Sequence, residues 1–349
     1  MEFDVSMRIT QTAPKNLMDS SGKPMVGQFD GIPQDLGVEL FRYKNEMDNS
    51  ASRWRQYFDY KQFQFVSVIS DNYIIGVALA DIRYLGSAFC YVYDIQNNAL
   101  IEETWLRPFS IDTATSPSPY SSVAHIGGKD VQFNIVDGQW QVVLNTRNVK
   151  ADLRLLPFPN QSLPLSMCTP TGYNGWTYTQ KHNALRIEGN LSVLDNNVDL
   201  TRSLASYDFS AGYMRRETSW RWASINHKAK GTTLGLNLAA GVNETGSCEN
   251  VFWVNGERHL LGPVHFDFVR SNDKEAQEPT RWRIYSDDGQ VDLEFQSINC
   301  RSEKLNLWLL KSNFRQFIGH FSGYIQDDQG TIHRLNNAIG LTEDHFARW

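Results

Sequence analysis

The stretch from Ser206 to Ser224 carries the side chains that are best suited to chemistry. Asp208 follows Tyr207 and precedes Gly212, a residue that can adopt the positive φ angles of a tight bend. A carboxyl group beside an aromatic wall can have its pKa raised by desolvation and then act as a general acid. The competing interpretation is a turn aspartate that accepts backbone N–H hydrogen bonds. Asp208 is therefore the candidate catalytic residue, and Tyr207 is a candidate wall of its site.

Two tryptophans in the same stretch indicate where a ligand would lie. From Glu217 onward the sequence alternates, so a strand would place Thr218, Trp220, Trp222 and Ser224 on one face. Aromatic rings among small hydroxyl residues suit the wall of an apolar cavity that has a few polar groups. They suit a packed β-sheet core about as well. Trp220 and Trp222 are thus predicted ligand contacts, with core packing as the alternative.

Charged and amide side chains supply further candidate ligand contacts, each with a structural alternative. Arg216 could clamp a carboxylate or phosphate, or pair with an acidic neighbour. Lys181 could orient an oxygen of a ligand, or lie at a solvated hairpin tip between two short strands. Asn237 interrupts an apolar strand and needs hydrogen-bond partners, which a ligand or the protein could supply. Asn250 could contact a ligand or cap a loop. His345 could titrate near neutral pH, or lie on a surface helix.

Composition and motifs exclude several classes of function. The net charge is −6 and the basic residues are scattered, which argues against a nucleic-acid-binding protein. No apolar run approaches the roughly 20 residues of a membrane span. The start of the chain lacks a signal-peptide pattern and the four cysteines are far apart, so we expect a cytoplasmic protein with reduced thiols. Metal-binding histidine spacings, a nucleophile elbow, a phosphate loop and a dinucleotide fingerprint are all missing, so we predict no metal and no cofactor.

The sequence between these candidates has the texture of a β protein. Asp137-Gly138, Asn255-Gly256 and Asp288-Gly289 each lie between alternating apolar runs, which predicts hairpins. Many short strands with such turns favour sandwiches or barrels over an α/β fold. A closed antiparallel barrel also has an interior that can hold one small ligand. We predict an all-β protein with two tandem antiparallel β-barrel domains and few short helices.

Proline positions predict where the chain divides. Four prolines lie in residues 157–170, and proline cannot donate to a strand ladder. We therefore expect an irregular arm and a first barrel in residues 1–156, a connection in 157–170 and a second barrel in 171–349. Residues 36–58 are compatible with a short helix or an entering strand. The last residues are predicted to form a short helix capped by Thr342.

Several short motifs recur in a characteristic order along the chain. They include Leu79-Ala80-Asp81-Ile82, Tyr178-Thr179-Gln180-Lys181-His182-Asn183, Tyr207-Asp208-Phe209, Trp220-x-Trp222-Ala223, Gly235-Leu236-Asn237-Leu238, Phe252-Trp253-Val254-Asn255-Gly256 and Glu343-Asp344-His345-Phe346-Ala347-Arg348-Trp349. Together they resemble the bacterial family known as domain of unknown function 2804, over nearly the whole chain. The sequence departs from that pattern at Arg221, where Asn is common, and at Arg186, where Pro is common.

More distantly, this layout is similar to two-lipocalin-domain proteins of the carotenoid 1,2-hydratase and AttH kind and to calycin-type cyclases. That resemblance implies a hydrophobic substrate in a barrel mouth or between two barrels, with proton transfer to an alkene from an acidic side chain.

Three functional hypotheses follow from these patterns. The first is a cofactor-independent hydratase, cyclase or isomerase that acts on a hydrophobic, lipid-like or isoprenoid-like molecule, with Asp208 as the acid. The second is a non-catalytic carrier with the same pocket. The third is a carbohydrate-binding or protein-interaction module that uses exposed aromatic side chains.

Overall fold

The chain divides into two compact units. We analysed a computed structural model, which describes residues 9–159, 162–229, 231–243, 246–270, 280–307 and 310–349. One unit is Thr10–Arg215, here called the N-terminal unit, and the other is built from Arg216–Trp349, the C-terminal unit. Each contains one curled sheet in which all neighbouring strands are antiparallel apart from a short parallel pair near the start of the chain. The prediction of an all-β protein with two tandem barrels is confirmed.

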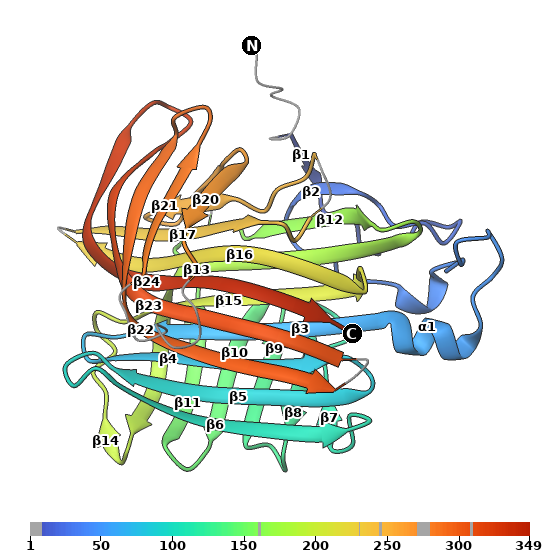
Figure 1. Ribbon diagram of the computed structural model, residues 1–349, viewed down its shortest axis with the longest axis horizontal. Helices are drawn as coiled ribbons and strands as arrows, with labels where there is room; N and C mark the ends of the chain where they lie inside the picture. Colours follow the sequence, from blue (N-terminus) through green and yellow to red (C-terminus); the bar gives the residue numbers. More distant parts are fainter. Residues whose placement is uncertain (1–8, 160–161, 230, 244–245, 271–279, 308–309) are drawn as a thin grey trace. The chain divides into compact units, whose positions relative to one another are not determined.

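Among its described residues, the N-terminal unit contains strands β1 to β15 and the short helices η2 and α1 (Figure 1). The helices are a 3-10 helix, η2 (Val38–Leu40), and α1 (Arg53–Asp59). The strands are β1 (Thr10–Thr12), β2 (Gly27–Asp30), β3 (Tyr60–Ile69), β4 (Tyr73–Asp81), β5 (Leu85–Asp94), β6 (Ala99–Pro108), β7 (Thr113–Ala114), β8 (Ser122–Ile126), β9 (Val131–Val136), β10 (Gln139–Asn145), β11 (Val149–Leu156), β12 (Leu165–Thr171), β13 (Gly175–Val193), β14 (Asn196–Asn197) and β15 (Leu204–Tyr213).

The sheet of the N-terminal unit closes almost completely into a barrel. Its main path runs β6-β5-β4-β3-β15-β13-β11-β10-β9-β8-β7. The edge strand β6 is tied to the turn between β10 and β11 by Glu103, whose carboxylate accepts hydrogen bonds from Thr146 Oγ1 (2.8 Å) and the Asn148 amide (2.9 Å). Trp105 of β6 also donates its indole N–H to Asp130 (3.2 Å). These side-chain bonds hold the edge strand β6 against the turns between β10 and β11 and between β8 and β9.

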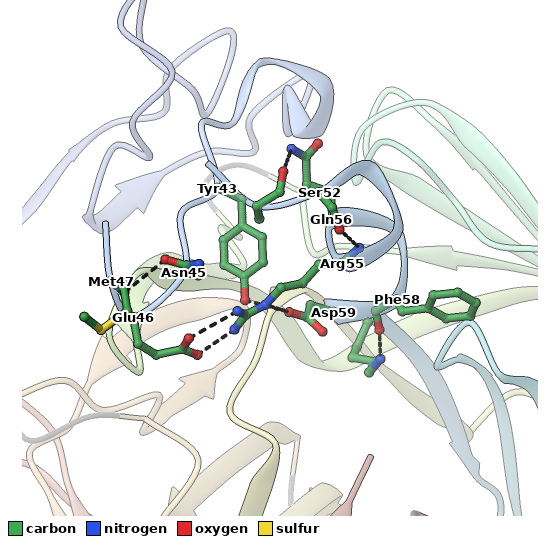
Figure 2. Close-up of polar contacts among 11 residues, drawn as sticks. Tyr43, Asn45, Glu46, Met47, Ser52, Arg55, Gln56, Phe58 and Asp59 are labelled. Carbon is green, nitrogen blue, oxygen red and sulfur yellow. Dashed lines mark hydrogen bonds and ion pairs between the residues drawn. The ribbon is translucent and has the colours of Figure 1, made fainter. Parts of the chain in front are cut away.

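An irregular arm before β3 ends in helix α1. Ser52 caps the helix by accepting a hydrogen bond from the Arg55 amide (3.2 Å). Figure 2 shows the Arg55 guanidinium between two carboxylates, bonded to Glu46 (2.5 Å) and to Asp59 (3.0 Å). The Tyr43 hydroxyl donates to the same Asp59 carboxylate (2.8 Å). The segment that was compatible with helix or strand is therefore helical just before the barrel begins.

In the part of the C-terminal unit that the structure describes, nine strands form a second, half-closed barrel. The sheet order is β19-β18-β17-β16-β24-β23-β22-β21-β20, and β20 curls back to contact β17 (Figure 1). The strands are β16 (Glu217–Ala229), β17 (Thr232–Ala240), β18 (Val251–Val254), β19 (Glu257–Leu260), β20 (Val264–Phe268), β21 (Arg281–Ser286), β22 (Val291–Leu307), β23 (Leu310–Gln326) and β24 (Ile332–Arg348).

The three predicted hairpins are present. Asp137-Gly138 joins β9 to β10 and Asn255-Gly256 joins β18 to β19, both with positive φ at the two turn residues. The third turn is longer than predicted, because β21 ends at Ser286 and β22 begins at Val291. Within it, the Asp288 carboxylate accepts hydrogen bonds from the Ser286 hydroxyl (2.6 Å) and the Gln290 amide (3.1 Å).

The predicted boundary in residues 157–170 is wrong. This segment connects β11 to β12 within one sheet, and the next strand, β13, spans nineteen residues that pair with β12 and β15 near its start and with β11 further on. The division between the compact units falls at Arg215 and Arg216 instead. Pro170 fits because β12 pairs only with β13 at that position, so its missing N–H breaks no ladder.

One local prediction is also wrong, and one of the two alternatives for Lys181 is excluded. The chain end is strand rather than helix, because β24 pairs with β16 on one side and with β23 on the other as far as Arg348. This pairing on both sides overrides the capping signal at Thr342. Lys181 is not at a hairpin tip either, since it lies inside β13, where its side chain is almost fully buried.

The cysteines behave as expected from their spacing. Cys90, Cys168, Cys248 and Cys300 are all free thiols, and the first three are buried. Burial raises the pKa of Cys90 and of Cys168 to about 12, which keeps them as unreactive thiols at neutral pH. In the part of the chain that the structure describes, no helix combines the length and the hydrophobicity that crossing a bilayer requires.

Candidate functional site

Asp208 forms an ion pair inside the N-terminal unit. It lies on β15 directly opposite Lys181 of β13, and the Lys181 ammonium is 2.5 Å from Asp208 Oδ2. Ser210 Oγ donates a second hydrogen bond to Asp208 Oδ1 (3.1 Å). Both charged side chains are largely buried, so each needs its partner to offset the cost of desolvation. The structure thus brings together two of the predicted site residues, as a lysine–carboxylate pair.

Tyr207 lies on the other face of β15, in the barrel core. Its ring stacks on Trp140 at 4.6 Å, and its hydroxyl accepts a hydrogen bond from Gln180 Nε2 (2.8 Å). Gln180 Oε1 in turn accepts from the Tyr178 hydroxyl (3.0 Å). Because side chains alternate along a strand, Tyr207 and Asp208 cannot face one cavity. The Tyr207 hydroxyl, the Gln180 amide and the Tyr178 hydroxyl therefore form one hydrogen-bonded chain in the core of the barrel.

Because the N-terminal unit buries several tyrosine side chains, we expect it to lose stability steeply at high pH. Burial raises the pKa of Tyr178 and of Tyr207 far above the usual 10, and that of Tyr213 to about 12. A raised pKa in the folded state means that the stabilisation is complete below pH 10 and is lost as the pH climbs through the folded-state values. In a titration followed by absorbance at 295 nm, we expect these buried phenols to ionise only as circular dichroism reports unfolding.

The control for this titration is the same protein in concentrated guanidinium chloride, where all phenols should ionise together near pH 10. Reversible ionisation of every tyrosine near pH 10 with an unchanged circular dichroism spectrum would contradict the prediction.

Trp222 and the two candidate asparagines make structural hydrogen bonds within the C-terminal unit. The Trp222 indole donates to Asn237 Oδ1 (2.7 Å), and Asn237 Nδ2 donates to the Glu249 carbonyl (2.7 Å). Asn250 accepts from the Ala239 amide (2.7 Å) and donates to the Gly262 carbonyl (2.9 Å). The protein itself therefore supplies the partners that the buried amide of Asn237 required.

Trp220 and His345 meet at a buried carboxylate on the same face of the sheet. The Trp220 indole donates to Glu343 Oε1 (2.8 Å), and the rings of Trp220 and His345 are 4.2 Å apart. His345 Nε2 is 2.9 Å from Ser312 Oγ, and Gln316 donates to the other oxygen of Glu343 (3.3 Å). His345 is thus held within strand β24 by its neighbours.

Arg216 is separate from these groups. It is exposed at the bend before β16, and its carbonyl accepts a hydrogen bond from the Trp349 amide (3.1 Å).

A cavity opens on the opposite face of the C-terminal sheet. It has a volume of about 360 Å³ and is lined by Arg221, Ala240, Val264, His265, Phe266, Phe268 and Arg270. None of the nine predicted site residues lines it. The apolar part of the wall comes from β20 and from the end of β17, which the curl of the sheet brings together. This volume is at the lower end of the range for small-molecule sites.

The polar part of this wall belongs to a cluster of three arginines around one carboxylate. Asp344 of β24 pairs in register with Arg221 of β16 and with Arg315 of β23. Its oxygens are 3.4 Å from Arg221 Nε, 3.4 Å from Arg315 Nη1 and 2.8 Å from both Nε and Nη2 of Arg270. Burial raises the pKa of Asp344, but the hydrogen bonds and charge of Arg270, together with Arg221 and Arg315, outweigh burial and leave this pKa lowered.

The arginine cluster was not predicted from sequence, although Arg221 had stood out as a departure from the family pattern. Its members lie on three different strands and on the segment after β20, so their spacing along the chain carries no motif. Among the described residues, no group of three or more His, Cys, Asp or Glu side chains is placed to hold a metal ion. The side chains around the cavity can instead contact an apolar molecule and bind an anionic group.

Comparison with solved structures finds proteins of similar fold. The structure of CghA with Sch210972 matches with a TM-score of 0.54 and 9% identity, over 97% of each chain. Kievitone hydratase from Nectria haematococca matches with a TM-score of 0.47 and 12% identity, over 82% of this chain and 88% of its own. A candidate AttH from Nitrosomonas europaea matches with a TM-score of 0.45 and 13% identity, over 81% and 91%. At such identities, the likeness to CghA shows a shared fold.

Comparison of the sequence with known families gives a more specific result. The search of curated proteins finds no match. The family model of the domain of unknown function DUF2804 matches residues 8–349, which is nearly the whole chain, and confirms the family expected from the motifs. The chain therefore belongs to the DUF2804 family.

Proposed function

We propose that this protein binds a hydrophobic small molecule in the cavity of its C-terminal unit. The observation that carries the proposal is the cavity itself, which has a floor of Ala240, Val264, Phe266 and Phe268. Phe268 is rigidly placed, because its ring stacks on Trp282 at 3.8 Å with an interplanar angle of 3°. A preformed hollow lined by both apolar and polar side chains is compatible with a small-molecule site.

Two features bear on the alternative hypotheses. Trp222 is only 8% exposed and the Trp220 indole is bonded to Glu343, so these tryptophans do not form a shallow surface platform for a sugar. The fold is shared with CghA, for which a structure with Sch210972 is known, and that precedent supports ligand binding over a purely structural role.

Cofactor-independent proton transfer is the second candidate function, and the buried Lys181–Asp208 pair favours it. An ammonium 2.5 Å from a carboxylate is a donor–acceptor pair in which a proton can move, and burial strengthens the coupling between the two groups. Such a pair could serve hydration, cyclisation or isomerisation. In this proposal Asp208 is the acid–base residue and Lys181 its partner.

The binding proposal is tested by narrowing the cavity. Ala240→Leu adds three carbon atoms to the wall, so we expect 1-decanol, a neutral probe, to bind the wild-type protein and to bind this variant at least tenfold more weakly. Isothermal titration calorimetry measures both affinities. Ala99→Leu is the matched control, since Ala99 is exposed at the start of β6, and it should bind like wild type.

The cavity assignment would be contradicted if Ala240→Leu bound 1-decanol as tightly as wild type. It would also be contradicted if neither wild type nor Ala99→Leu bound 1-decanol. Mass spectrometry of an organic extract of the natively purified protein identifies the natural ligand class. The same extraction after incubation with that ligand separates the two functions, because a carrier returns the compound unchanged and an enzyme returns it with altered connectivity or mass.

A further inference from the structure

Two arginines at the cavity share a single carboxylate among the residues that the structure describes. Arg221 and Arg270 both contact this carboxylate, which belongs to Asp344. Arg221 and Arg270 also line the cavity. A guanidinium that shares its carboxylate at a cavity wall favours an anion from outside the chain, above all at Arg221, whose side chain is 26% exposed.

Some guanidinium N–H groups of Arg221 and Arg270 have no hydrogen-bond acceptor among the described residues. A guanidinium has five N–H groups in a planar fork. Arg270 uses Nε and Nη2 for Asp344, and Arg221 uses Nε for Asp344 and Nη1 for Ser219. Among the described residues, Arg270 Nη1 and Arg221 Nη2 have no partner. These are the groups that would bind a ligand oxygen.

A buried hydroxyl beside the cluster is also unpartnered. Thr342 lies two residues before Asp344 on β24, hence on the same face of the sheet, and its side chain is fully buried. Its Oγ1 has no hydrogen-bond partner among the described residues. Buried hydroxyls nearly always find a partner, so this one points independently to a polar group that the described residues do not supply.

The charged and apolar walls are continuous. The Arg270 guanidinium lies 5.6 Å from the centre of the Phe268 ring, so the cationic end of the cavity begins where its aromatic wall ends. We infer that the molecule bound in this cavity is amphiphilic, with an apolar body against Phe266 and Phe268 and an anionic head group held by Arg221 and Arg270. This inference rests on the proposed function and adds the chemical class of its ligand.

The test compares probes that share a decyl chain and differ in their head group. Titration calorimetry of the full-length protein measures binding of 1-decanol, decanoate, decyl phosphate and decylammonium at concentrations below aggregation. We expect decanoate or decyl phosphate to bind roughly tenfold or more tightly than decanol, because each gains charge-assisted hydrogen bonds to arginine. Decylammonium should bind more weakly than decanol, because it meets like charge.

Variants at Arg270 assign the effect to the cluster. Arg270→Gln should weaken binding of the preferred anion roughly tenfold and change decanol binding less than twofold, while Arg270→Lys should retain part of the preference. Arg270 is half exposed, and Asp344 keeps two other arginines, so we expect both variants to fold. Arg283→Gln is the matched control, because Arg283 is an exposed arginine of β21 paired with Asp292 and does not line the cavity.

The outcomes separate the two proposals. If decanol binds but neither anion binds more tightly, or if Arg270→Gln keeps the full preference for the anion, the anionic head group is wrong and the hydrophobic site stands. If no probe binds at all, the proposed function is wrong. The preferred head group among the two anions distinguishes a carboxylate ligand from a phosphate ligand.

Discussion

Replacing Asp344 by Asn is expected to destabilise the C-terminal unit by about 3 kcal/mol, because it removes the one carboxylate shared by three arginines. Asp344 itself is only 5% exposed, so the loss is near the lower bound for breaking a buried ion pair, reduced by the half-exposed position of Arg270. The three guanidiniums would then repel one another across neighbouring strands. The midpoint of urea unfolding, followed by tryptophan fluorescence, measures the change.

The same substitution changes the response to acid. The pKa of Asp344 is lowered in the folded state, so its contribution to stability is present above the ordinary value near 4 and is lost as the pH falls through the folded-state value. Asp344→Asn should remove that part of the acid sensitivity. Asp292→Asn is the matched control, since Asp292 forms only an exposed pair with Arg283 and should cost less than about 0.5 kcal/mol. Equal stability of Asp344→Asn and Asp292→Asn would show that the cluster contributes nothing.

Replacing Gly212 by Ala is expected to have the larger effect and to cost about 4 kcal/mol or more, enough to prevent folding. Gly212 has a φ of 152°, and a Cβ at this position would lie 2.1 Å from the Trp176 carbonyl oxygen and 3.0 Å from Thr177 Cα. Both atoms belong to the backbone of β13, which pairs with β15 here and cannot move aside without breaking the ladder. Loss of soluble protein and of protected amides in hydrogen exchange would report the defect.

Gly128→Ala separates the cost of a positive φ angle from the cost of a clash between the new Cβ and the neighbouring backbone. Gly128 also has a positive φ, 62°, and lies in the same unit, but a Cβ there would meet nothing within 4 Å. This control should therefore show only the cost of a left-handed conformation, about 1–2 kcal/mol. A Gly212→Ala protein as stable as Gly128→Ala would mean that the strands can separate locally to admit the methyl group.

Gly212 also illustrates the reach of local sequence reasoning. A glycine after an acidic residue predicted a tight bend, and the positive φ is indeed present. The residue nevertheless lies inside a continuous strand, where the backbone of β13 approaches too closely for a side chain. The presence of glycine in the sequence shows only that the backbone is free to adopt unusual φ angles. That Gly212 is required here follows from the close approach of Trp176, more than thirty residues away in the sequence.

The position of each predicted site residue within its sheet determines which groups its side chain contacts. The alternation in β16 placed Trp220 and Trp222 on one face, as predicted, since period-two patterning is a local property. What those rings contact was not local. Their indoles reach Glu343 and Asn237 on neighbouring strands, and these partners were specified by sheet register. The candidates that looked available for a ligand were therefore engaged by the protein.

The sequence by itself determined the family, the all-β class and the hairpins at Asp137-Gly138 and Asn255-Gly256, because motif order, alternation and turn chemistry are all local. The tertiary structure alone decided the boundary at Arg216, the strand at the chain end and the arginine cluster at the cavity. Each of these depends on pairing between strands distant in sequence. Asp344 meets Arg221 and Arg315 only because β24 lies between β16 and β23, and a register shift of one residue would turn Asp344 to the opposite face.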